Sequence, residues 1–272
     1  EMDMPRPAHD PNDDHVDPPS VPVTATGDRW LCGRHVVVCG DSTDPAVIAE
    51  LLDGENADMV WTDPPYGVDY EGKTKEALKI EGDAIDFGAL TSLLRDAFGA
   101  AIAATREGAV WHVAAPSGPQ SLAFATVLTE LDVWHQCYVW VKDQFVLGHS
   151  DFHYRHELVF YGWTPGAAHQ APPERTWDTV WEIPRPRRST EHPTMKPVEL
   201  VERALRLNSK PDAIVLDPFG GSGTTMLAAH RTGRVARLVE KDPAYVDVIC
   251  RRYQQLTGEQ PTREEVPENF LG

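Results

Sequence analysis

A short turn in the sequence places two hydrogen-bond acceptors beside an aromatic ring. Asp63-Pro64-Pro65-Tyr66 directly follows residues 58–62, which we expect to form a buried strand. Consecutive prolines fix φ and have no N–H to donate, so the turn presents the Asp63 carboxylate and the Pro64 carbonyl as acceptors. Ligands bind open α/β sheets at the carboxyl ends of parallel strands, and a turn at such a position could hold a group with two N–H donors.

The exocyclic amine of adenine or cytosine is such a group, but it is a poor nucleophile because its lone pair is conjugated with the ring. Two acceptors on its hydrogens would localise the lone pair and aim it at an electrophilic methyl group. Tyr66 could stack on a base swung out of a duplex, since a base inside the duplex cannot be reached. We therefore take Asp63, Pro64, Pro65 and Tyr66 as candidate catalytic residues; the alternative is a plain Pro-Pro loop with a surface tyrosine.

A second segment, residues 214–225, has the pattern of a strand, a glycine-rich turn and a helix. Glycines let the backbone approach a ligand closely, and the helix N-terminus offers free N–H groups. No lysine follows the glycines, which excludes a P-loop, and Met226 stands where a dinucleotide fingerprint needs its last glycine. Asp217 at the strand end instead favours a ligand with a positively charged amino group, such as the methionine moiety of S-adenosylmethionine.

A second carboxylate supports a ligand of this kind. Glu240 ends the next expected strand, 23 residues after Asp217. A Rossmann-like fold places an acidic residue on a ribose diol at an offset of roughly 20 residues. The alternative is a structural turn with a solvent-exposed glutamate.

Together the two turns resemble the catalytic and cofactor motifs of S-adenosylmethionine-dependent DNA amino-methyltransferases. The catalytic motif comes first, which resembles the circularly permuted β group, and the chain is similar to methylases found near partition-type genes. The resemblance runs from about His35 to Gly258 and implies S-adenosylmethionine as the cofactor, DNA as the partner and a homodimer. Asp rather than Ser at position 63 resembles the adenine-modifying members, so methylation of adenine N6 is favoured over cytosine N4.

Three shorter segments also resemble this family. Residues 40–42 are similar to the segment that contacts the cofactor's adenine, 192–197 to the segment before the cofactor helix, and 240–245 to the ribose-binding segment. The cofactor-binding residues that the motifs and the resemblance imply are Asp41, Ser42, Asp63, His192, Thr194, Lys196, Asp217, Phe219, Gly220, Gly221, Ser222, Gly223, Thr224, Thr225, Glu240 and Lys241.

The elements that must position these residues alternate between short apolar strands and helices. Strands are expected at 35–39, 58–62, 109–113, 133–141, 154–161, 213–216 and 235–239, and helices at 43–52, 86–105, 119–131, 197–208, 222–232 and 243–256. Near-continuous apolar strands between helices are typical of a parallel sheet covered on both faces. The resemblance implies a Rossmann-like α/β fold with a seven-stranded, mostly parallel sheet containing one antiparallel strand.

The ends of the chain differ from its centre in composition. Residues 1–28 are rich in proline and aspartate and have no periodicity, so we expect a disordered acidic tail. Residues 29–258 are expected to form a single methyltransferase domain, and 259–272 a C-terminal tail. The formal net charge of −17 lies partly in these ends, but the remaining body is still acidic. Bulk charge therefore counts against nucleic-acid binding, since phosphate contacts normally need Lys and Arg.

The embedded segment of about 134–190 is the expected target-recognition region, because it combines five tryptophans with a group of basic residues. Most of its aromatic residues could equally be core, and lysines in the loop after Tyr66 could be plain surface residues. The candidate nucleic-acid contacts are Lys73, Lys142, Arg155, Arg185, Arg187 and Arg188.

Other features of the sequence restrict the class of protein. The four cysteines form no CxxC pair, the histidines at 149, 153 and 156 lack ligand spacing, and no apolar run is long enough for a bilayer. We therefore expect a cytoplasmic protein with reduced thiols and no metal. Cytosine N4, RNA or a protein amide remain alternative substrates, and a catalytically silent nucleic-acid-binding module is the non-enzymatic alternative.

Overall fold

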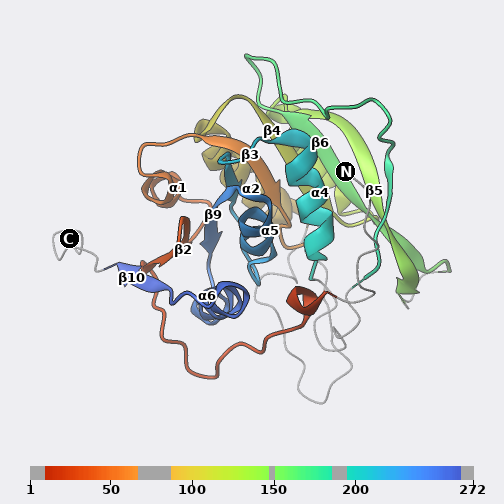
Figure 1. The fold of residues 1–272 in the computed structure, drawn as a ribbon. Helices are drawn as coiled ribbons and strands as arrows, with labels where there is room; N and C mark the ends of the chain where they lie inside the picture. Colours follow the sequence, from red (N-terminus) through yellow and green to blue (C-terminus); the bar gives the residue numbers. More distant parts are fainter. Residues whose placement is uncertain (1–9, 67–86, 147–150, 186–194, 265–272) are drawn as a thin grey trace.

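A computed structural model of the chain describes residues 10–66, 87–146, 151–185 and 195–264, and within these ranges ten strands form one sheet (Figure 1). The central seven strands, in spatial order, are β2 (His35–Cys39), β9 (Val235–Glu240), β8 (Ile214–Asp217), β3 (Ala57–Thr62), β4 (Thr105–Ala115), β6 (Tyr154–Trp163) and β5 (Trp134–Val146). Of these seven, β6 runs antiparallel to both of its neighbours. The predicted mostly parallel sheet with one antiparallel strand is thereby confirmed.

Three short strands extend the sheet beyond the predicted seven. β1 (Arg29–Cys32) pairs antiparallel with β2 and with β10 (Thr262–Glu264), while β7 (Val180–Glu182) pairs parallel with β5 at the other edge. The strand count of seven was therefore too low, and the sheet includes part of the predicted C-terminal tail. Strands of three or four residues are too short for a period of two to be recognised in the sequence.

Helices cover both faces of the sheet, as predicted. One apolar cluster joins the sheet to α4 (Val198–Asn208), α5 (Thr224–Thr232) and α6 (Pro243–Thr257), and the other joins it to α1 (Pro45–Leu52), α2 (Phe87–Ala103) and α3 (Ser121–Glu130). Val37 packs in the first cluster and its neighbours Val36 and Val38 in the second, as expected of a strand buried on both faces. None of the helices in the described ranges is long and apolar enough to cross a bilayer.

The chain leaves the sheet in opposite directions after two neighbouring strands. From β8 it passes through α5, on one face, to β9; from β3 it passes to α2, on the other face, and then to β4. β3 and β8 are parallel and adjacent, with Val60 opposite Leu216. Such a divergence is a topological switch point, where open α/β sheets bind ligands outside the carboxyl ends of the strands.

The acidic segment that precedes β1 packs on the helices. Asp13 Oδ1 accepts a hydrogen bond from the Val198 backbone N–H at 2.8 Å, at the start of α4, and Asp10 pairs with Arg231 at 2.5 Å. The structure gives defined positions to residues 10–28, so the prediction of disorder over 1–28 is wrong for these residues. Their aspartates are partners of helix ends and arginines, which composition alone does not distinguish from free acidic side chains.

Candidate active site

Four carboxylates line the carboxyl edge of the central strands. Asp63, Asp217, Glu240 and Asp41 stand at or just after the ends of β3, β8, β9 and β2, which are neighbours in this order. The two glycine- and proline-containing turns, more than 150 residues apart in sequence, therefore meet on one edge of the sheet. The shared site predicted from the sequence requires this convergence.

Asp217 is tied to both turns. Its Oδ1 accepts hydrogen bonds from Thr62 Oγ1 at 2.8 Å and from the Phe219 backbone N–H at 3.1 Å, and its Oδ2 accepts one from Thr225 Oγ1 at 2.5 Å. Burial raises the pKa of Asp217 to about 7, although the hydrogen bonds from Thr225 and Thr62 act in the opposite direction. The Thr62 contact fixes the end of β3, next to Asp63, against the end of β8.

The glycine-rich turn has a backbone that other residues would not adopt easily. Gly221 and Gly223 have φ of 51° and 82°, in the left-handed region. A Cβ at Gly223 would also lie 2.9 Å from the Ile249 side chain of α6. Gly223 is the N-cap of α5 and has no side chain to cap it, so N–H groups of the first helical turn remain for a ligand.

Glu240 lies against this turn from the neighbouring strand. Its Oε2 accepts a hydrogen bond from the Gly221 backbone N–H at 2.7 Å, and its Oε1 accepts one from the Asp242 N–H at 2.8 Å. Burial raises the pKa of Glu240 to about 7, against the effect of these hydrogen bonds. The carboxyl group therefore gains or loses its proton near neutral pH.

Asp41 lies at the far end of the row. Its Oδ1 accepts hydrogen bonds from the Thr43 N–H at 3.0 Å and from Thr43 Oγ1 at 2.7 Å, while Oδ2 pairs with Lys241 Nζ at 3.2 Å. Burial raises the pKa of Asp41, but the Thr43 hydrogen bonds and Lys241 outweigh it and lower the pKa overall. Ser42 is buried, and the Lys241 side chain is mostly exposed.

The Asp63 carboxylate of the Asp-Pro-Pro-Tyr turn is held from two sides, by Tyr66 of the same turn and by Lys196 from the segment before α4. The Tyr66 hydroxyl donates to Asp63 Oδ1 at 2.8 Å, and Lys196 Nζ donates to Oδ2 at 2.6 Å. The Tyr66 ring packs edge-on against Phe124 of α3, with the ring centroids 6.2 Å apart. Burial raises the pKa of Asp63, and Lys196 opposes this effect. Lys196, predicted to lie near the cofactor, is thus in direct contact with the candidate catalytic carboxylate.

Sequence reasoning missed one charged residue of the site, Glu157 on β6. Its Oε1 pairs with Lys142 Nζ at 2.5 Å, and its Oε2 contacts Lys196 Nζ and the Tyr66 hydroxyl, each at 3.0 Å. Burial raises the pKa of Glu157, but Lys196 and Lys142 outweigh it and lower the pKa to about 2. An acidic residue beside the apolar run 158–160 is a usable signal, because buried carboxylates are rarely left unpaired.

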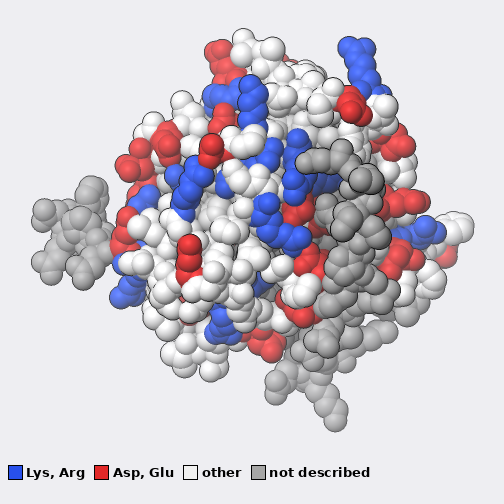
Figure 2. Space-filling view, viewed as in Figure 1, with Lys and Arg blue, Asp and Glu red and all other residues white. Residues whose placement is uncertain are grey.

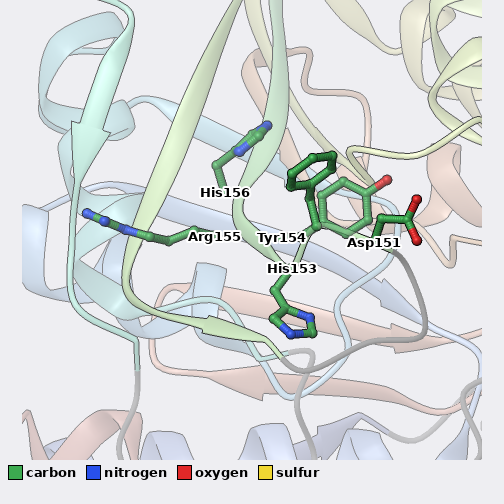
Figure 3. Close-up of a pocket in the computed structure, with 6 residues that line it drawn as sticks. Asp151, His153, Tyr154, Arg155 and His156 are labelled. Atoms are coloured by element: carbon green, nitrogen blue, oxygen red, sulfur yellow. The ribbon is translucent and has the colours of Figure 1, made fainter.

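The predicted nucleic-acid contacts divide into buried and exposed side chains. Lys142 is only 6% exposed and paired with Glu157, so its prediction as a DNA-contacting surface residue is wrong. Arg155 is exposed, and its Nε donates to the Lys142 carbonyl at 3.1 Å. It points away from Asp151 and Tyr154, which line the same pocket (Figure 3). Arg185 is partly exposed just after β7.

Five of the predicted site residues lie outside the part of the chain that the structure describes: Lys73, Arg187, Arg188, His192 and Thr194. In the described ranges no group of three or more His, Cys, Asp or Glu side chains is arranged to hold a metal ion.

Comparison with known sequences identifies relatives of this arrangement. The DNA methylase family matches residues 57–251. The type II methyltransferase M.ScaI of Streptomyces caespitosus is 36% identical over 83 residues, which are 28% of this chain and 27% of that protein. M.HinfI of Haemophilus influenzae is 25% identical over 245 residues, 76% of this chain and 66% of that protein. The match thus spans about a quarter of the first relative and just under two thirds of the second.

Solved structures share the fold. A Thermus thermophilus protein, provisionally assigned as a DNA modification methylase and solved with S-adenosyl-L-methionine, has a TM-score of 0.60 at 22% identity, covering 82% of this chain and 94% of its own. The cytosine-N4-specific PvuII DNA methyltransferase has a TM-score of 0.57 at 18% identity, covering 82% of this chain and 89% of its own. At these identities the similarity is one of fold alone.

The family match begins at β3, includes the Asp-Pro-Pro-Tyr turn and the glycine-rich turn, and ends within α6. It covers well over half of the chain and both parts of the candidate site. This chain belongs to the DNA methylase family.

Proposed function

We propose that this protein transfers a methyl group from S-adenosylmethionine to the exocyclic amine of a DNA base, with adenine N6 as the favoured target. The observation that carries the proposal is the meeting of the two turns at the β3–β8 switch point, where Thr62 links Asp217 to the strand end that bears Asp63. A methyl donor held by one turn would face an amine held by the other.

The residues at the β8, β9 and β2 ends suit the donor. Asp217 and the uncapped start of α5 would receive the methionine end, Glu240 the ribose hydroxyls and Asp41 the adenine. A buried and a half-buried carboxyl group, Asp217 and Glu240, each with a pKa of about 7 beside a glycine turn, are costly to the fold, which is typical of groups kept for a ligand. When bound, S-adenosylmethionine supplies the electrophilic methyl group on its sulfonium.

The residues at the β3 end would prepare the nucleophile. Asp63 and the Pro64 carbonyl accept hydrogen bonds from the two N–H groups of the target amine and direct its lone pair toward the donor turn. Each oxygen of Asp63 already has one donor, Tyr66 or Lys196, but a carboxylate oxygen has a second lone pair and can accept the amine as well. Transfer would then be direct, with no covalent enzyme intermediate. The amine nitrogen would bond to the methyl carbon as the bond between that carbon and the sulfonium sulfur breaks, and the proton that the amine loses would pass through the Asp63 carboxylate to solvent.

The β5–β6 hairpin is the proposed contact to DNA beside this edge. β5 ends and β6 begins at the same edge as Asp63, and the hairpin carries the exposed aromatic residues Phe152, 88% exposed, and Tyr154, 45% exposed. Arg155 follows them and Arg185 lies near the end of β7, where each could reach a phosphate. Basic side chains are intermingled with acidic ones on the face in Figure 2. The net charge of −17 leads us to expect few phosphate contacts.

Two bases are candidate targets of the methylation. Aspartate at position 63 favours adenine, whereas the fold is shared with a cytosine-N4-specific enzyme, which makes cytosine N4 the second candidate. The test is to incubate the protein with isotopically labelled S-adenosylmethionine and with DNA, RNA or protein, then digest each substrate and identify the modified residue by mass spectrometry. We expect N6-methyladenine in DNA; N4-methylcytosine would reverse the base assignment, and label in RNA or protein alone would contradict the proposal.

A further inference from the structure

Four buried or half-buried charges of alternating sign form a continuous chain behind the candidate catalytic turn. Lys142 on β5, Glu157 on β6, Lys196 before α4 and Asp63 after β3 are joined by contacts of 2.5, 3.0 and 2.6 Å. Their side chains are 7%, 15%, 4% and 26% exposed, in the same order. Asp63 is therefore the end of the chain that is most open to a ligand.

We infer that Glu157 is a positioning residue for methyl transfer, which holds the Tyr66 hydroxyl and the Lys196 ammonium so that Asp63 and the Tyr66 ring face the target base. The inference rests on the proposed role of Asp63 as the acceptor of the amine. Glu157 itself lies behind Tyr66 and Lys196 and acts through them.

Lys196 and Tyr66 each lie within hydrogen-bond distance of both carboxylates. Lys196 Nζ has three N–H groups and donates to both, whereas the Tyr66 hydroxyl has one proton and donates to one of them at a time. The Tyr66 hydroxyl lies 2.8 Å from Asp63 and 3.0 Å from Glu157, and Lys196 Nζ lies 2.6 Å and 3.0 Å from the same two carboxylates. Lys196 Nζ is also 5.0 Å from the centroid of the Tyr66 ring. With Asp63 as its sole partner in this chain of charges, Lys196 would be held by one contact, and Glu157 supplies the second.

The charges of these residues are a second reason to assign a positioning role to Glu157. The Lys196 ammonium pairs with two carboxylates, Asp63 and Glu157. Its interaction with Asp63 Oδ2 is therefore weaker and competes less with the hydrogen bond from the target amine. Without the negative charge of Glu157, Lys142 would lose its partner in this chain of charges, and Lys196 would pair with Asp63 alone. A buried charge without its partner is strongly unfavourable, so this rearrangement would move Asp63.

A purely structural role for Glu157 makes a different prediction. If Glu157 serves only to neutralise Lys142, then removing both charges should restore everything that Glu157→Gln loses. If Glu157 positions Tyr66 and Lys196, removing both charges should restore stability and leave turnover low. Lys142 contacts neither Tyr66 nor Asp63 in the described contacts, so the double variant separates the two roles.

The experiment compares Glu157→Gln, Lys142→Met and the double variant with the wild type and with Glu130→Gln, a surface carboxylate on α3. Thermal unfolding, S-adenosylmethionine affinity by calorimetry, and kcat and KM for DNA are measured for each. Glu157→Gln is expected to lower kcat about 10- to 100-fold, with the affinity for S-adenosylmethionine and the KM for DNA changed less than about threefold. The double variant should recover Tm but not kcat.

Two results would overturn the inference: wild-type kcat in Glu157→Gln, or recovery of kcat together with Tm in the double variant. The failure of the proposed function is a separate outcome, because it is seen in the wild type. A wild-type protein that methylates no DNA contradicts the proposed function, whereas an active wild type with an equally active double variant contradicts only the role of Glu157.

Discussion

At the scale of single residues, Asp63 must accept a substrate amine while two protein groups hold it in place. Tyr66 and Lys196 use one lone pair on each oxygen, and both contacts are short enough to fix the plane of the carboxylate. The ion pair with Lys196 opposes the rise in pKa that burial causes. The ion pair therefore favours the carboxylate, which is the acceptor form that the chemistry needs.

Replacement of Asp63 tests this role directly. Asp63→Ala is expected to lower kcat by at least about 100-fold, because the amine loses an acceptor that is aligned before the reaction. The S-adenosylmethionine affinity, measured by calorimetry on the same preparation, should stay within a few-fold of the wild type. Near-normal turnover in this variant would remove Asp63 from the mechanism.

The raised pKa values of Glu240 and Asp217 predict a pH dependence of cofactor binding. Both groups have pKa values of about 7 in the folded protein, above their ordinary values of 4.5 and 3.8. Ribose hydroxyls and an ammonium group interact best with the carboxylate form, so binding should release protons and the affinity should increase from about pH 6 to about pH 8. Calorimetry in two buffers of different ionisation enthalpy measures the released protons.

Glu240→Gln is the matched control for this titration. It keeps the size of the side chain and should bind S-adenosylmethionine more weakly, with a smaller increase in affinity over the same pH range. In the absence of cofactor the same raised pKa values make the folded wild type lose stability as the pH rises from about 4 to 7, since the unfolded chain ionises first. An affinity independent of pH, without proton release, would exclude the ribose role of Glu240.

At the scale of elements, the site depends on how the ends of β3 and β8 are fastened to each other. The hydrogen bond from Thr62 Oγ1 to Asp217 Oδ1, 2.8 Å long and buried, is the direct side-chain link between them. Thr62→Val removes the donor and keeps the shape. We expect the free energy of unfolding to fall by about 1–2 kcal/mol and the S-adenosylmethionine affinity to weaken.

Urea denaturation with calorimetry checks the Thr62 prediction. Thr91→Val is the control, since Thr91 donates to the carbonyl of Phe87 on the exposed side of α2, and no described hydrogen bond joins it to β3 or β8. Its effect on the free energy of unfolding should stay within about 0.5 kcal/mol. Equal losses in the two valine variants would mean that the β3–β8 link contributes nothing specific.

Sequence patterns were sufficient to predict the strands that carry the two motifs. They were insufficient to predict the short edge strands and the ion pair behind the catalytic turn. The buried strands β3, β8 and β9 are apolar runs that end in polar turns, so the sequence alone places Asp63, Asp217 and Glu240 together. β7 and β10 have three residues each and are defined by pairing with distant strands. From the sequence alone, Lys142 cannot be distinguished from a surface lysine. Its pairing with Glu157 of β6 depends on the tertiary structure.

At the scale of the whole molecule, a net charge of −17 limits how DNA can be bound. Most of the chain should repel phosphates, so binding must depend on a few arginines close to the site and on contacts to the base itself. Arg155 and Arg185 are the described residues that we expect to carry phosphate contacts. Affinity should therefore be modest and only moderately dependent on salt.

The salt dependence of DNA binding measures these contacts. We expect Arg155→Ala with Arg185→Ala to reduce the slope of log K against log salt concentration by about 2, one for each lost phosphate contact. Arg34→Ala is the control, because Arg34 pairs with Asp212 ahead of β2 and β8, at the opposite, amino edge of the sheet. An unchanged slope in the double variant would place the DNA on another surface.

The proposed mechanism depends most on a shared site between the β3 and β8 turns, and a crystal structure with bound S-adenosylmethionine tests this most directly. The predicted result has the ribose hydroxyls on Glu240, the methionine end at Asp217 and the start of α5, and the methyl group directed at Asp63. A cofactor bound elsewhere, or with its methyl group directed away from Asp63 and Pro64, would contradict the proposed mechanism.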